Sequence, residues 1–163
     1  MHVQGISDII KRIAIIGCVA MGTVTAATAD SFTRAWVSVE RTGKISHALK
    51  NAWQHSPLYP ELIAELTEKR LGSISAQDLE TLMAQYPDSA AIANLRWKKL
   101  FRLGRANWYK DFLFLYRPTD SVELNCYKLE ARYRLKQAKD ADHREAVRLW
   151  THGKSQPKAC DTL

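Results

Sequence analysis

The sequence lacks the short motifs that identify several enzyme classes. It has no G-x-x-x-x-G-K-[ST] phosphate loop, no H-E-x-x-H zinc motif and no C-x-x-C pair. Its 5 histidines are scattered, and neither His47 with His55 nor His143 with His152 is spaced to ligate a metal from one helical turn. We therefore predict no catalytic residue, no metal site and no cofactor in this chain.

Signals for β-structure are also missing, because no segment alternates strictly between apolar and polar residues. Apolar residues instead recur at helical spacing in segments of about ten to seventeen residues, separated by short links that contain Pro, Gly, Asp or Ser. In residues 74–89, Ser75 and Asp78 form a start signal similar to a capping box. The inward face predicted for this segment is Leu79, Leu82, Met83 and Tyr86.

Other segments give similar predictions. Residues 89–105 predict an inward face of Ala93, Trp97, Leu100 and Phe101, with Gly104 as the C-terminal cap. The next predicted faces are Val122, Cys126, Leu129 and Tyr133, and then Ala146, Leu149 and Trp150 with Gly153 as a cap. The fold class predicted is all-α, an α-superhelical solenoid of antiparallel helix pairs; a compact helical bundle is the alternative.

The N-terminus has the pattern of a secretory signal. Basic residues at Lys11 and Arg12 precede an almost uncharged run that ends in Ala27-Thr28-Ala29. This order predicts a cleaved signal peptide at 1–29, with Asp30 as the first residue of a domain at 30–163. A periplasmic location follows from the prediction.

Cleavage after Ala29 has two alternatives. A membrane anchor is disfavoured because the apolar run is short and rich in Gly, Thr and Ala, so no stable membrane span is predicted. A lipoprotein signal is the second alternative, since residues 15–18 fit a lipobox ending at Cys18, although few apolar residues precede it.

Removal of the signal peptide changes the net charge and the number of cysteines in the domain. The net charge of +7 falls to +6 once Lys11, Arg12 and Asp8 are removed. Such an excess suits an anionic partner, and export disfavours nucleic acid. Cleavage also leaves Cys126 and Cys160, an even count that favours a disulfide over two buried thiols in an oxidising compartment.

The remaining polar and aromatic groups are interpreted structurally. Glu65 with Lys69 and Glu130 with Arg134 are predicted to be ordinary surface pairs at i, i+4. A solvated helix face is predicted for the basic cluster Lys98, Lys99, Arg102 and Arg105. Core packing rather than sugar stacking is predicted for most of Trp97, Trp108, Tyr109, Tyr116, Tyr127, Tyr133 and Trp150.

One stretch is more specific than this helical pattern. "LWTHGKSQPKACD", Leu149–Asp161, resembles a hallmark of the N-terminal superhelical U-domain of soluble lytic murein transglycosylases. Residues 57–62, 86–116 and 122–132 agree with that domain in order and spacing. The resemblance implies a partial U-shaped ring of helices and a disulfide between Cys126 and Cys160.

The same resemblance places catalysis elsewhere. Members of that family cleave the MurNAc–GlcNAc bond of peptidoglycan with a glutamate in a Glu-Ser motif, and here no Glu precedes a Ser. We therefore expect a truncated, non-catalytic portion that serves as a scaffold or associates with peptidoglycan. The alternative is a stand-alone periplasmic helical-repeat module that binds proteins. Self-association through an exposed solenoid end is also expected.

Overall fold

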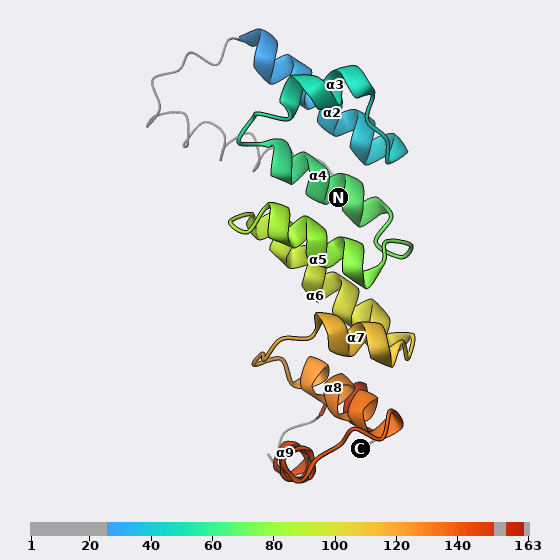
Figure 1. Cartoon of the computed structure of the whole chain (residues 1–163). Helices are drawn as coiled ribbons and strands as arrows, with labels where there is room; N and C mark the ends of the chain where they lie inside the picture. The colour runs from blue at the N-terminus through green and yellow to red at the C-terminus, as the bar shows by residue number, and fades with distance from the viewer. Residues whose placement is uncertain (1–25, 152–155, 162–163) are drawn as a thin grey trace. The chain divides into compact units, whose positions relative to one another are not determined.

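A computed structural model describes residues 26–151 and 156–161 of the chain. The chain divides into two compact units, Met1–Trp53 and Gln54–Leu163. Within the described residues every regular element is helical, and none is a strand (Figure 1). The predicted all-α fold class is therefore confirmed.

The first unit contains the helices α2 (Ala26–Thr42) and α3 (His47–Trp53). Phe32 joins them, because its ring lies edge-on to Trp53 with the ring centroids 5.1 Å apart. The chain leaves α2 at Gly43, whose positive φ of 64° suits a residue without a Cβ. The Gly43 N–H donates to the carbonyl of Val39 at 2.8 Å, which satisfies one of the free carbonyls at the helix end.

The second unit is a succession of short helices. They are α4 (Tyr59–Lys69), α5 (Ala76–Gln85), α6 (Ala90–Arg105), α7 (Tyr109–Leu115), α8 (Val122–Arg134), α9 (Asp140–Trp150) and the 3₁₀ turn η1 (Lys158–Cys160). In Figure 1 they follow one another in chain order from green to red. Contacts join α4 with α6, α5 with α7, and α6 with α8, so alternate helices pack together as in a stack of helix pairs.

Serine residues begin three of these helices. The hydroxyls of Ser75, Ser89 and Ser121 accept hydrogen bonds from backbone N–H groups three residues further on, at 3.0, 3.3 and 3.4 Å. The Ser75 hydroxyl also donates to Asp78 at 2.7 Å, so the start signal predicted there is confirmed. Pro60 lies in the first turn of α4, where its missing N–H is not needed.

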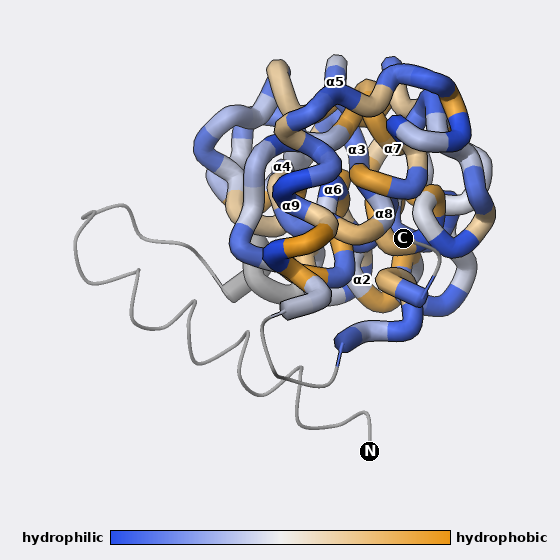
Figure 2. The backbone as a smooth tube through the Cα atoms, turned by 90° about the horizontal axis from the view of Figure 1, so that it is seen from below, coloured by the Kyte–Doolittle hydropathy of each residue, from blue (hydrophilic) through white to orange (hydrophobic). Residues whose placement is uncertain are grey.

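Two hydrophobic clusters form the core of this unit, and α8 contributes to both. Leu124, Tyr127 and Ala131 belong to the cluster formed with α4 to α7. Cys126 and Leu129 belong to the second cluster, with Leu149 of α9 and the residues around η1. In Figure 2, α6 and α8 carry hydrophobic stretches near the middle of the view, whereas much of the outer rim is hydrophilic.

The predicted inward faces of α5 and α8 are confirmed. On α5, Leu79 is fully buried, and Leu82, Met83 and Tyr86 pack against the first cluster. Val122, Cys126, Leu129 and Tyr133 of α8 all lie in or against the second cluster.

The predicted face of α6 is wrong by a rotation about the helix axis. Its buried residues are Ile92, Leu95, Lys99, Leu100, Leu103 and Gly104. Leu100 is buried as predicted and Phe101 is half-buried, but Ala93 and Trp97 lie on an exposed side. The buried stripe contains Ile92, Leu95 and Leu103, which together bury more apolar surface than Trp97 would. Periodicity alone did not indicate which of the two stripes faces the core.

Gly104 was predicted to cap α6, and this prediction is also wrong. The helix continues to Arg105 and then ends through Asn107, which has a positive φ of 58°. Gly104 is instead a point of close approach between helices, since a Cβ placed there would lie 2.6 Å from the ring of Tyr127. A residue without a side chain is what allows α6 and α8 to pack this closely.

We predict that Gly104→Ala lowers the free energy of unfolding by about 1–3 kcal/mol, because the added methyl overlaps the Tyr127 ring. The intrinsic helix preference favours Ala by about 1 kcal/mol, so the sign of the change isolates the packing effect. Chemical denaturation measures it.

Gly72→Ala is the matched control. A Cβ there would meet only the end of the flexible Arg102 side chain, at 2.8 Å, and a small change is expected. Equal stability of Gly104→Ala and the natural protein would contradict the close packing.

Candidate functional site

The two cysteines of the predicted disulfide are joined in the structure. Cys126 of α8 and Cys160 of η1 form the bond, with their Cα atoms 5.0 Å apart and a sequence separation of 34. Both side chains are buried in the second cluster. A loop of this length corresponds to about 3–4 kcal/mol of stabilisation in the chain-entropy account. This buried bond therefore fixes η1 onto α8 and has a structural role.

The residues of the predicted signal cleavage site lie at the start of α2. Ala27, Ala29 and Asp30 fall within its first turns, and cleavage before Asp30 stays a prediction. Cys18, the residue of the lipoprotein alternative, lies outside the described residues, as does Gly153, the predicted cap of α9. None of the helices in the described ranges is long and apolar enough to cross a membrane.

Metal ligation was not predicted, and the described part of the chain brings no three His, Cys, Asp or Glu side chains into a group that could hold an ion. His143 has a specific neighbour nevertheless. Its Nδ1 lies 2.7 Å from the hydroxyl of Tyr133, and the two rings meet edge to face. This pair links α8 to α9.

The basic cluster on α6 differs from its prediction at Lys99. This side chain is only 2% exposed, and its ammonium donates to the carbonyls of Leu71 and Ile74 at 2.9 and 2.7 Å. Burial, followed by the charge of Arg102, lowers the pKa of Lys99. Lys99 thus closes the turn between α4 and α5, whereas Lys98 remains at the surface in a pair with Glu68 at 2.5 Å.

Polar residues of α8 are also buried, and each has a partner. Asn125 accepts from the hydroxyl of Tyr116 at 2.5 Å and donates to the carbonyl of Thr119 at 3.0 Å. Lys128 pairs with Glu145 of α9. These contacts remove the cost of burying unpaired polar groups on a helix that is surrounded by protein.

The predicted pair of Glu130 with Arg134 is present, but it is not an ordinary surface pair. Glu130 is buried; it accepts from the Tyr109 hydroxyl at 3.1 Å and lies 3.7 Å from Arg134. Burial first, and then the bond to Glu130, raises the pKa of Tyr109. The other predicted pair, Glu65 with Lys69, lies at the surface at 3.4 Å as expected.

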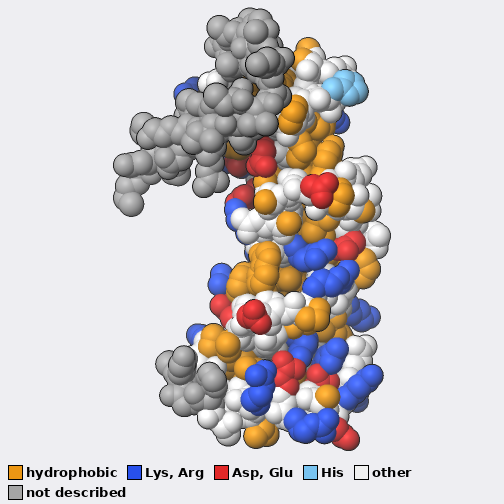
Figure 3. Space-filling view, turned by 90° about the vertical axis from the view of Figure 1, so that its left-hand side faces the viewer, with side chains coloured by type: hydrophobic (Ala, Val, Ile, Leu, Met, Phe, Trp, Pro, Cys, Tyr) orange, Lys and Arg blue, Asp and Glu red, His pale blue; other side chains and the backbone are white. Residues whose placement is uncertain are grey.

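Asp142 is the centre of the charged contact between α8 and α9. It is 1% exposed, with one oxygen 2.6 Å from Arg132 and 3.9 Å from Lys128. Its other oxygen accepts from the backbone N–H of Lys139 at 2.9 Å. In Figure 3, Lys and Arg side chains surround acidic ones over the lower part of the second unit, where α8 and α9 lie.

Burial alone would raise the pKa of Asp142. The Lys139 N–H, the hydrogen bond from Arg132 and the charges of Arg132 and Lys128 outweigh burial, and the net result is a lowered pKa. This arrangement holds a permanent charge, so it supports structure rather than proton transfer.

Three tryptophans are exposed, which contradicts the prediction of core packing for them. Trp97, Trp108 and Trp150 are 41, 54 and 51% exposed. Tyr109, Tyr116, Tyr127 and Tyr133 do pack in or against the core. Trp150 was also predicted to face inward from α9, and this is wrong, whereas Leu149 is buried and Ala146 packs against the second cluster as predicted.

One exposed tryptophan lines a shallow groove of about 380 Å³ between α5 and α6. The lining residues are Glu80, Met83, Ala84, Tyr86, Pro87, Ala93, Arg96 and Trp97. Sequence reasoning missed the groove because it requires Ala93 and Trp97 to face outward. At i, i+4 these two side chains lie one above the other on α6.

An ion pair lies beside the apolar wall of this groove. Glu80 is 3.4 Å from Arg96 and 2.8 Å from Arg117, which follows α7. One carboxylate thus faces two guanidinium groups, of which Arg96 lines the groove and Arg117 lies outside its lining. The Arg96 Nε has no hydrogen-bond partner, although it is buried.

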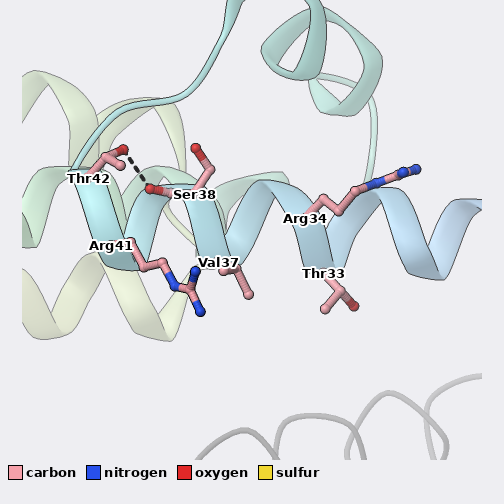
Figure 4. A pocket seen from close by; sticks show the side chains of 6 residues that line it. All are labelled: Thr33, Arg34, Val37, Ser38, Arg41 and Thr42. Atoms are coloured by element: carbon pink, nitrogen blue, oxygen red, sulfur yellow. Dashed lines mark hydrogen bonds between the residues drawn. The ribbon is translucent and has the colours of Figure 1, made fainter.

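A second hollow lies in the first unit. Figure 4 shows that it follows one side of α2 alone, where Thr33, Arg34, Val37, Ser38, Arg41 and Thr42 line it. The Thr42 hydroxyl donates to the Ser38 carbonyl at 2.7 Å. Among the residues that the structure describes, only α2 contributes walls to this hollow, so the groove between α5 and α6 is the better candidate site.

Comparison with models of protein families and with curated proteins gives no match. Among solved structures, an inactive mutant of the lytic transglycosylase Slt from Pseudomonas aeruginosa is similar to this chain, with a TM-score of 0.66 and 28% sequence identity. The similarity covers 81% of this chain and 22% of that one. The chain thus corresponds to a minor part of the length of that enzyme.

We predict an acid-dependent loss of stability that depends on Asp142. Since its pKa in the folded protein lies below its unfolded value, its stabilising effect is full above the unfolded pKa, near 3.9. The effect is lost as pH falls through the folded pKa. Asp142→Asn should cost about 1–3 kcal/mol at pH 7 and flatten the dependence of unfolding free energy on pH below about 4.

Asp140→Asn is the control, because Asp140 is exposed in the same first turn of α9. It shares the interaction with the helix dipole but not the contacts with Arg132 and Lys128. An unchanged pH profile in Asp142→Asn would show that these contacts do not stabilise the fold.

Proposed function

We propose that this chain is the non-catalytic superhelical portion of a lytic murein transglycosylase and acts as a scaffold on peptidoglycan in the periplasm. The observation that carries the proposal is the similarity of 81% of the chain to Slt at 28% identity. The bonded pair Cys126 and Cys160 supports it, since the resemblance in the sequence implied that pair.

The chemistry of the described residues is consistent with a scaffold. The buried ionisable groups Lys99, Glu130 and Asp142 are all held in contacts that link helices. Each therefore already has a structural role. Cleavage of peptidoglycan is accordingly assigned to the family rather than to these helices.

Export follows from the same proposal. A buried disulfide is typical of proteins that fold in oxidising compartments, and the sequence pattern before Asp30 supplies the signal. We propose cleavage after Ala29, with the exported domain beginning inside α2. Lipidation at Cys18 remains the alternative to cleavage after Ala29.

A second function, protein binding by a helical repeat, is supported by α9. Val147 and Trp150 lie on this helix at i, i+3 and are 62 and 51% exposed. An apolar strip at one end of a helical stack favours association with another protein or with a second copy.

We predict that the exported protein cosediments with purified murein sacculi and releases no anhydro-muropeptides from them. Chromatography of the supernatant after long incubation measures the release. Binding that persists at about 0.5 M salt, where exposed charges are screened, separates recognition from simple charge attraction.

A basic protein of similar net charge is the control for non-specific adsorption. Failure to sediment above this control would contradict association with peptidoglycan, and released anhydro-sugars would contradict the non-catalytic role. The intact mass of the exported protein reports separately on cleavage before Asp30.

A further inference from the structure

We propose that the groove between α5 and α6 binds a glycan of N-acetylated amino sugars that carries a carboxylate, with Trp97 as the stacking surface. The inference rests on the proposed association with peptidoglycan for the source of such a glycan. It adds the site, the chemical class of the ligand and the residues that contact it.

The first argument is the exposure of Trp97. Helix α6 buries a different stripe of residues, so packing of the core does not account for Trp97. Its side chain lies at the surface and is 41% exposed. Met83 and Ala93 extend the apolar surface on either side of the groove. The flat apolar face of a pyranose packs against an indole, and the methyl of an N-acetyl group fits beside small apolar side chains.

The second argument is the polar edge of the groove. Glu80 and Arg96, which line the groove, present planar groups that can accept and donate hydrogen bonds, as sugar hydroxyls and amides require. Arg117 lies outside the lining and donates to Glu80 and to the carbonyls of Phe114 and Tyr116, so its charge adds to that of Arg96 against the single carboxylate. Arg is the side chain best suited to a carboxylate ligand, because its donors match the two oxygens.

The third argument is shape. A volume of about 380 Å³ lies at the lower end of the range for small-molecule sites. The groove is shallow and runs along the surface between α5 and α6, which suits a chain that continues on both sides of the bound sugar. The other two exposed tryptophans, Trp108 and Trp150, line neither this groove nor the hollow on α2.

The test is a titration of the full exported protein followed by NMR. The probes are the reduced disaccharide GlcNAc–MurNAc, which carries a carboxylate, and neutral diacetylchitobiose. We expect shifts of the Trp97 indole N–H and the Met83 methyl with both probes, and tighter binding of the disaccharide that carries the carboxylate. Trp97→Ala should weaken binding by about tenfold or more.

Two variants serve as controls. Trp108→Ala removes a tryptophan that lies outside the groove and is more exposed than Trp97, and it should leave affinity unchanged. Arg117→Gln should reduce the preference for the charged disaccharide while retaining the binding of chitobiose. The shifts in the natural protein locate the site even where a variant folds poorly.

Several results would overturn the inference. These are shifts away from the groove, equal loss of affinity in Trp97→Ala and Trp108→Ala, and binding of a glycan-free murein peptide in place of the sugars. Sedimentation with sacculi separates this inference from the proposed function. Sacculus binding that is unchanged in Trp97→Ala rejects the groove but retains the scaffold.

Discussion

The structure of the second unit depends on the burial of α8 on all sides. Every residue from Leu124 to Ala131 is buried, although this segment includes Asn125, Lys128 and Glu130. A helix in this position joins two hydrophobic clusters, and each of its polar groups must find a partner inside the protein. The partners come from α7, from the link between α7 and α8, and from α9. The hydrogen bonds and ion pairs that these polar groups require therefore hold α7, the link that follows it and α9 in place against α8.

The same constraint explains two other features. Gly104 is the point at which α6 approaches α8, because the Tyr127 ring occupies the space of a side chain. The bond from Cys126, the residue next to Tyr127, secures η1 on a neighbouring face of α8. Close packing with α6 and a covalent link to η1 make α8 the common support of this unit.

Sequence periodicity predicted the helices well and their orientations unevenly. The stripe on α5 was identified because its apolar residues recur on one helical face. On α8 the predicted stripe is buried, but periodicity did not indicate that Asn125, Lys128 and Glu130 are buried as well. On α6, Trp97 was predicted to be inside, since no local rule indicates that Lys99 turns inward to reach the carbonyls of Leu71 and Ile74. Those carbonyls are distant in sequence, so the inward lysine and the outward tryptophan follow only from tertiary contacts. The groove was missed for the same reason.

Hydrogen exchange, followed by mass spectrometry with the disulfide intact and reduced, tests the central role of α8 most directly. The account predicts that amides from Asn125 to Arg134 exchange most slowly in both states. Reduction should accelerate exchange in α9 and η1 first. Exchange of α8 as fast as that of α9 in the intact protein would contradict the account.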